Sequence, residues 1–121
     1  MAVIGHRARV TCAVLLVAGS ARAEDSPLGA DKALHFSACA GIAAAGYAGS
    51  WLIAQPVEAR LGTAVGLALF AGVAKELLDI RGFGTPSTLD LAWDLAGAVV
   101  GASLAWLTDW LVTRWRESPA R

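Results

Sequence analysis

The chain has 121 residues, of which 56% are hydrophobic and 17% are charged, and its formal net charge at pH 7 is +0. A chain of this length holds a single domain, and its apolar composition is unusual for a soluble protein of the same size, so a membrane location is expected. The balanced charge and the lack of a basic stripe with interleaved aromatic residues argue against a nucleic-acid partner.

Residues 1–23 have the pattern of an export signal. A basic start that includes Arg7 and Arg9 precedes a short apolar run over residues 10–18 and a small-x-small cleavage site at residues 21–23. The uncharged run is well short of the roughly 20 residues that a bilayer crossing needs. We therefore expect cleavage, with retention as an anchor as the alternative.

The remaining residues, 24–121, are predicted to form one all-α domain, a small membrane bundle of three helices. The first helix is expected over about residues 31–54 and the second over about 57–80, with Pro56 in the turn between them. The third is expected over about residues 87–116. Its start carries Ser87 as an N-cap and Asp90 in the capping-box position.

Helix packing and topology follow from the same pattern. Small residues recur four apart, as close packing of membrane helices requires, at Ser37, Gly41 and Ala45, at Gly62 and Gly66, and at Gly97 and Gly101. The uncharged spans of the second and third helices are short, so a shallow or re-entrant arrangement is the alternative to full crossings. A cleaved N-terminus places the start of the first helix outside the bacterial inner membrane, with the Arg60 turn in the cytoplasm.

Ionisable residues lie at corresponding ends of the three expected helices. Antiparallel neighbours bring the start of the first helix, the end of the second and the start of the third to one membrane face, which is the periplasmic face. The acidic and histidine residues there are Asp31, His35, Glu76, Asp79, Asp90 and Asp94, and the basic ones are Lys32, Lys75 and Arg81. Spacings of three or four residues place the members of each pair on one helix face.

Charged residues gathered in this way can have several alternative roles. The bases can neutralise the acids in a network of ion pairs that locks the helix ends. The six acidic and histidine residues are also candidate ligands for a divalent ion such as Mg²⁺, Ca²⁺, Mn²⁺ or Zn²⁺. Lys32, Lys75 and Arg81 are candidates for binding a lipid phosphate. His35, Glu76 and Asp94 are candidate catalytic residues, with His35 as a general base.

Three sequence blocks carry a family resemblance. The order Asp31-Lys32-x-x-His35-Phe36, then Lys75-Glu76-x-x-Asp79, then Ser87-x-x-Asp90-x-x-x-Asp94-x-x-Gly97-x-x-x-Gly101 resembles the YfiM-type family of small periplasmic or envelope lipoproteins. It is also distantly similar to VanZ-like membrane proteins. The resemblance implies a cell-envelope setting and, through the VanZ-like kinship, a link to glycopeptide tolerance or lipid-linked cell-wall chemistry.

The leading functional hypothesis is a non-enzymatic envelope membrane protein that uses the cluster for structure or for binding lipid headgroups. The first alternative is a metal-assisted hydrolase or transferase that acts on lipid-linked phosphate. The second is a small subunit of an envelope complex, with other envelope proteins as partners. The two alternatives differ from the leading hypothesis in requiring, respectively, a metal and a partner protein.

Overall fold

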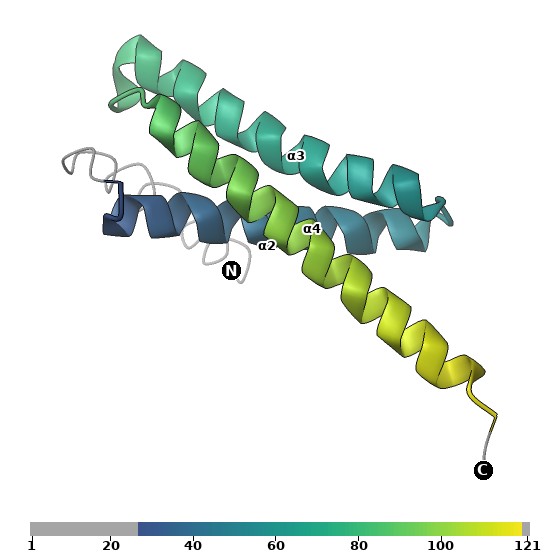
Figure 1. Ribbon diagram of the computed structural model, residues 1–121. Coiled ribbons are helices and arrows are strands. Elements are labelled where there is room, and N and C mark those ends of the chain that lie inside the picture. Colours follow the sequence, from purple (N-terminus) through teal and green to yellow (C-terminus); the bar gives the residue numbers. More distant parts are fainter. Residues whose placement is uncertain (1–26, 120–121) are drawn as a thin grey trace, which may run out of the picture.

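A computed structural model describes residues 27–119, which form three α-helices and contain no strand. The helices are α2 (Ala30–Leu52), α3 (Val57–Leu78) and α4 (Thr88–Glu117), and a π-helical turn, η2 (Asp79–Phe83), extends α3 (Figure 1). The all-α fold with three helices is therefore confirmed. The expected signal peptide, residues 1–23, lies outside the described residues.

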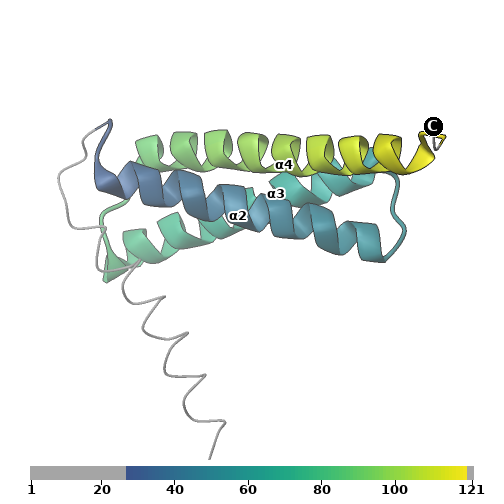
Figure 2. The ribbon, with the colours of Figure 1, turned by 90° about the horizontal axis from the view of Figure 1, so that it is seen from below.

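Each helix runs antiparallel to the one before it (Figures 1 and 2). Helix α2 packs against both α3 and α4, and α3 also contacts α4. The start of α2, the end of α3 and the start of α4 consequently lie at the same end of the bundle. This arrangement brings together three segments that are far apart in the sequence.

The end of α3 differs from the expected boundary near residue 80. The chain continues through η2, and the helical run ends at Gly82, which has a φ of 99°. Glycine adopts this left-handed conformation without steric strain because glycine has no Cβ. A glycine in this conformation commonly terminates a helix. The extra turn carries Asp79 and places its buried carboxylate against Gly84.

The interior of the bundle is built from small residues. Its buried apolar members are Cys39, Ala43, Tyr47, Ala64, Ala68, Ala98 and Ala102. Gly97 and Gly101 lie so close to the backbone of Phe36 and Ala40 that a Cβ at either glycine would collide with it. The absence of two side chains is therefore what allows α4 and α2 to approach at backbone contact.

The other small-residue stripes predicted from the sequence are wrong. Gly41, Gly62 and Gly66 have no neighbour within 4 Å of a built Cβ and are exposed, as are Ser37 and Ala45. Spacing alone identified the right periodicity but the wrong face of α2 and α3, because both helices are rich in small residues on every side.

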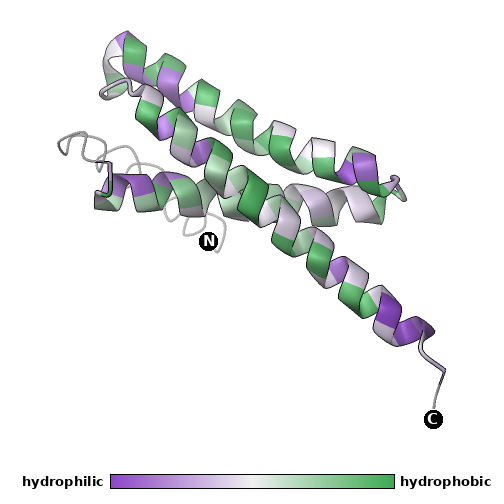
Figure 3. Cartoon of the chain, viewed as in Figure 1, coloured by the Kyte–Doolittle hydropathy of each residue, from purple (hydrophilic) through white to green (hydrophobic). Residues whose placement is uncertain are grey.

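The outer surface of the bundle is strongly apolar. Large hydrophobic side chains are exposed along α3 and α4, among them Phe70, Leu77, Leu104 and Leu111. In Figure 3 the apolar colour dominates the middle of these helices, and the polar colour gathers at their ends. Two segments, residues 57–83 and 88–117, are long and apolar enough to cross a membrane.

Candidate functional site

The shared end of the bundle holds a buried set of charged side chains, here called the polar cluster. Its members are Asp31, Lys32 and His35 from α2, Lys75, Glu76 and Asp79 from α3 and η2, and Asp90 and Asp94 from α4. Asp90 and Asp94 are 2% and 1% exposed, and they are the largest fully buried side chains of the described chain. Eight of the nine residues singled out in the sequence thus converge on one place.

His35 lies at the centre of the polar cluster. Its Nδ1 atom is 2.8 Å from Asp94 Oδ1, and its Nε2 atom is 3.2 Å from Asp90 Oδ2 and 3.8 Å from Asp31 Oδ1. A proton on Nδ1 is donated to Asp94 and fixes the ring orientation. The other ring nitrogen then faces two carboxylates, which accept but do not donate hydrogen bonds when ionised.

Two lysines bridge the helices within the cluster. Lys32 of α2 donates to Asp90 of α4 and to its neighbour Asp31, at 3.1 Å in the second case. Lys75 of α3 donates to Asp79 at 2.6 Å, and its Nζ atom is 3.6 Å from Asp90 Oδ2. Asp90 therefore receives a cation from each of the other two helices, so it ties the three chain segments together.

Glu76 has a local structural role at the start of α4. Its Oε2 atom accepts a hydrogen bond of 2.7 Å from the Ser87 backbone N–H, while Ser87 Oγ accepts one of 3.3 Å from the Asp90 backbone N–H. The N-cap at Ser87 thus agrees with the sequence prediction. The reciprocal half of the capping box is supplied by Glu76 from another helix, because the Asp90 carboxylate is bound to the two lysines and faces His35.

The cluster carries more negative than positive groups. Five carboxylates face two lysines and one histidine. Two buried carboxylate oxygens, Glu76 Oε1 and Asp94 Oδ2, have no hydrogen-bond partner among the described residues. Glu76 Oε1 still lies 3.5 Å from Lys75 Nζ, so Asp94 Oδ2 is the more poorly compensated of the two. A guest that brings positive charge or N–H donors suits this surplus.

Arg81 lies outside the group to which the sequence assigned it, and Cys39 lies beside that group without having been singled out for it. Arg81 is exposed on η2 and does not belong to the buried polar cluster. Cys39 is buried, and its Sγ atom is 3.3 Å from Asp94 Oδ1. Its position one helical turn after His35 is the signal that could have placed it beside the cluster.

A crevice of about 180 Å³ opens between α2 and α3 beside the polar cluster. One part of its lining is apolar and includes Leu34, Ala38, Ile42 and Ala71. The other part is polar and comprises Asp31, His35, Lys75 and Asp94. Such a lining is complementary to an amphiphilic molecule, because it offers charged groups at one end and apolar side chains along the side.

Three of the candidate metal ligands form a compact group. One ligand atom each from Asp31, His35 and Asp90 lie within 4.8 Å of one another. The remaining candidates are engaged elsewhere, since Glu76 and Asp79 pair with Lys75 and Asp94 binds the far side of the imidazole. A carboxylate on the second nitrogen of a ligating histidine is a common support for metal binding.

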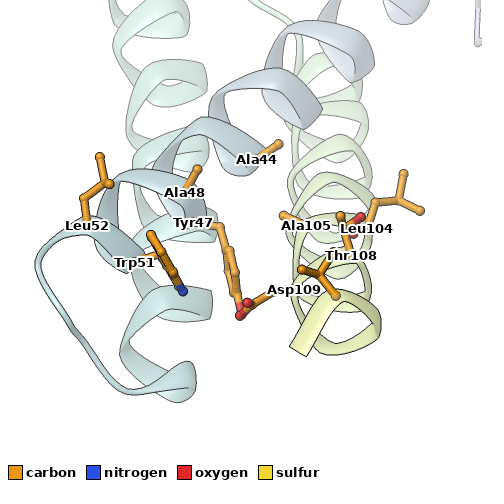
Figure 4. A pocket seen from close by; sticks show the side chains of 10 residues that line it. Ala44, Tyr47, Ala48, Trp51, Leu52, Leu104, Ala105, Thr108 and Asp109 are labelled. Carbon is orange, nitrogen blue, oxygen red and sulfur yellow. Dashed lines mark hydrogen bonds between the residues drawn. The ribbon is translucent and has the colours of Figure 1, made fainter. Parts of the chain in front are cut away.

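A second polar group lies at the other end of the bundle and was not anticipated from the sequence. Asp109 accepts hydrogen bonds from the Tyr47 hydroxyl at 2.8 Å and from Arg60 Nη1 at 3.0 Å. It lines an open apolar groove of about 590 Å³ between the separating ends of α2 and α4, with Trp51 and Leu104 on its sides (Figure 4). A lone acid within an apolar helix is the signal that could have found it.

Comparisons with known proteins give no counterpart: no family model, curated protein or solved structure matches this chain.

Proposed function

We propose that this chain is a small, non-enzymatic membrane protein of the bacterial cell envelope that binds the headgroup of a membrane lipid at its polar cluster. The crevice between α2 and α3 carries this proposal. Its apolar walls suit an acyl chain, and its polar end suits a headgroup. The ion pairs of the cluster, in the same proposal, hold the three helix ends in register around that site.

The membrane setting is supported by the distribution of apolar side chains. Segments 57–83 and 88–117 have the length and composition of membrane spans. Helix α2 has 23 residues, which at 1.5 Å per residue gives about 35 Å, comparable with a hydrocarbon core of roughly 30 Å. A third crossing by α2 therefore belongs to the proposal, and burial of its polar residues against α3 and α4 makes that crossing tolerable.

The orientation within the envelope is part of the same proposal. A cleaved export signal starts α2 on the periplasmic side of the inner membrane, so the polar cluster faces the periplasm. The groove beside Asp109 then lies toward the cytoplasm. Exposed tryptophans Trp51, Trp106 and Trp110 lie toward that second boundary, where aromatic side chains are enriched.

The test is lipid retention by the full chain purified in mild detergent and analysed by native mass spectrometry. Ala71→Phe places a ring in the crevice, and Ala45→Phe adds the same ring on an exposed face of α2 outside it. We expect the wild type and Ala45→Phe to retain bound lipid and Ala71→Phe to lose most of it. Equal retention by all three, or retention by none, would contradict lipid binding at this site.

A second candidate function is favoured by the compact group formed by Asp31, His35 and Asp90. A divalent ion held there would polarise a phosphoryl oxygen or activate water, as a hydrolase or transferase on lipid-linked phosphate requires. Elemental mass spectrometry of the purified protein, after washing with a chelator and reloading, tests this alternative. A stoichiometric metal that is lost in Asp90→Asn supports it, and a metal-free protein that still retains lipid excludes it.

A further inference from the structure

The poorly compensated oxygen of Asp94 indicates which chemistry the crevice takes. Asp94 is 1% exposed, and its Oδ1 atom is near His35 Nδ1 and Cys39 Sγ, at 2.8 and 3.3 Å. Its Oδ2 atom has no hydrogen-bond partner among the described residues. A buried carboxylate oxygen without a hydrogen-bond donor destabilises the folded protein. A bound molecule that donates an N–H or O–H group to this oxygen therefore binds more favourably.

The Asp94 carboxylate reaches the crevice from the far side of the bundle. It belongs to α4, yet it lines the space between α2 and α3 and lies directly against Gly72 of α3. A Cβ at residue 72 would collide with Oδ2. Glycine at this position is therefore what allows a carboxylate from the third helix to reach a crevice formed by the other two.

Charges of both signs line the polar end of the crevice. Asp31 and Asp94 contribute two carboxylates, and Lys75, whose side chain is 22% exposed, contributes an ammonium group. The complementary guest carries a positive donor group next to a negative group. Because Leu34 and Ile42 continue the lining with hydrocarbon, the complement also has an apolar tail.

We infer that the crevice binds an aminophospholipid, a lipid whose primary ammonium group is adjacent to its phosphate. This inference rests on the proposed lipid-binding function and specifies the headgroup. The ammonium donates to Asp94 Oδ2 and faces Asp31, the phosphate lies toward Lys75, and an acyl chain follows Leu34 and Ile42. A quaternary ammonium has no N–H to donate, so a choline headgroup leaves Asp94 Oδ2 without a partner.

The inference is tested by titrating the detergent-purified full chain with phosphatidylethanolamine, phosphatidylcholine and phosphatidylglycerol of identical acyl chains, read by native mass spectrometry. We expect phosphatidylethanolamine to bind at least about tenfold more tightly than either of the others, as a charge-assisted hydrogen bond allows. In Asp94→Asn, whose side-chain amide can present N–H groups instead of a carboxylate oxygen, we expect that preference to vanish. Thermal unfolding in detergent checks that this variant still folds.

Each other outcome has a defined meaning. Equal affinity for the ethanolamine and choline lipids, or tighter binding of phosphatidylglycerol, overturns the headgroup assignment and leaves lipid binding standing. Absence of binding by any lipid overturns both proposals. Equally tight binding of phosphoethanolamine without acyl chains assigns the crevice to a soluble amine, and displacement of the lipid by millimolar Mg²⁺ assigns the polar end to a metal. If Asp94→Asn does not fold, the affinities of Ala45→Phe and Ala71→Phe for phosphatidylethanolamine are compared instead. Weaker binding by Ala71→Phe alone places the lipid in the crevice, and equal binding by both overturns that placement.

Discussion

At the scale of single residues, Asp90 is the carboxylate of the polar cluster that lies near a lysine from each of the other two helices. Its carboxylate pairs with Lys32, lies near Lys75 and His35, and is almost completely buried. In a buried ion pair, the two partners depend on each other more than either contributes alone, because removing one leaves an uncompensated charge. The pair formed by Lys32 and Asp90 is therefore suited to a double-mutant cycle.

We predict that Lys32→Met destabilises the bundle by up to about 3–5 kcal/mol, the usual cost of removing one partner of a buried ion pair, because Asp90 then keeps only one lysine of the cluster, the more distant Lys75 at 3.6 Å. Replacing Asp90 by Asn in the same chain removes that charge and is expected to restore part of the loss. Chemical denaturation in detergent measures all four members of the cycle. Additive effects of the two substitutions would show that the pair is not coupled.

Glu76 supports a second residue-scale prediction because it caps the backbone of another segment. Glu76→Ala removes the acceptor of the Ser87 N–H and is expected to cost about 1–3 kcal/mol, the range for a lost buried hydrogen bond. Glu76→Gln retains an oxygen acceptor and is expected to cost less. Thermal unfolding in detergent compares both with Glu58→Ala, an exposed acid on the same helix. A loss for Glu58→Ala as large as that for Glu76→Ala would refute the capping role.

At the scale of the elements, the closest helix contact depends on two glycines of α4. Gly101 faces the backbone of Ala40, whereas Gly66 of α3 faces open space. We predict that Gly101→Ala destabilises the bundle by roughly 1–3 kcal/mol, as overpacking does. Gly66→Ala is the matched control and is expected to be neutral, or stabilising by up to about 1 kcal/mol through helix propensity. Unfolding of both variants in detergent gives the comparison, and equal effects would rule out a contact-specific role for Gly101.

How far the sequence predicts the structure also differs between elements. Helix positions and the convergence of Asp31, His35, Asp90 and Asp94 follow from apolar run lengths and antiparallel connections, which are local and topological properties. The face on which Ala64 and Ala68 of α3 pack does not follow, because small residues surround that part of the helix and only contacts with the other helices select one face. Two further features depend on distances between helices, which residue spacing within one helix does not encode. They are the capping of the Ser87 N–H by Glu76 of another helix and the position of the Asp94 carboxylate against Gly72.

At the scale of the whole molecule, the proposed membrane topology predicts a pattern of accessibility. In a chain with Cys12 and Cys39 replaced by Ala, single cysteines at the exposed positions Leu28 and Thr85 are expected to react with an impermeant thiol reagent added from outside. A cysteine at the exposed Glu58 is expected to react only after the membrane is permeabilised. Labelling of all three from outside in intact cells would exclude three crossings.

The length and direction of α4 have a consequence for its surroundings. This helix has 30 residues, about 45 Å at 1.5 Å per residue, and in Figure 1 its last turns extend past the ends of its two neighbours. In the proposed membrane setting, a helix of this length is expected to tilt, with Arg114 and Trp115 near its end placed to lie at the membrane–water interface. The tilt angle of α4 relative to the bilayer normal would then decrease as the lipid acyl chains become longer, so the orientation of this helix would depend on bilayer thickness.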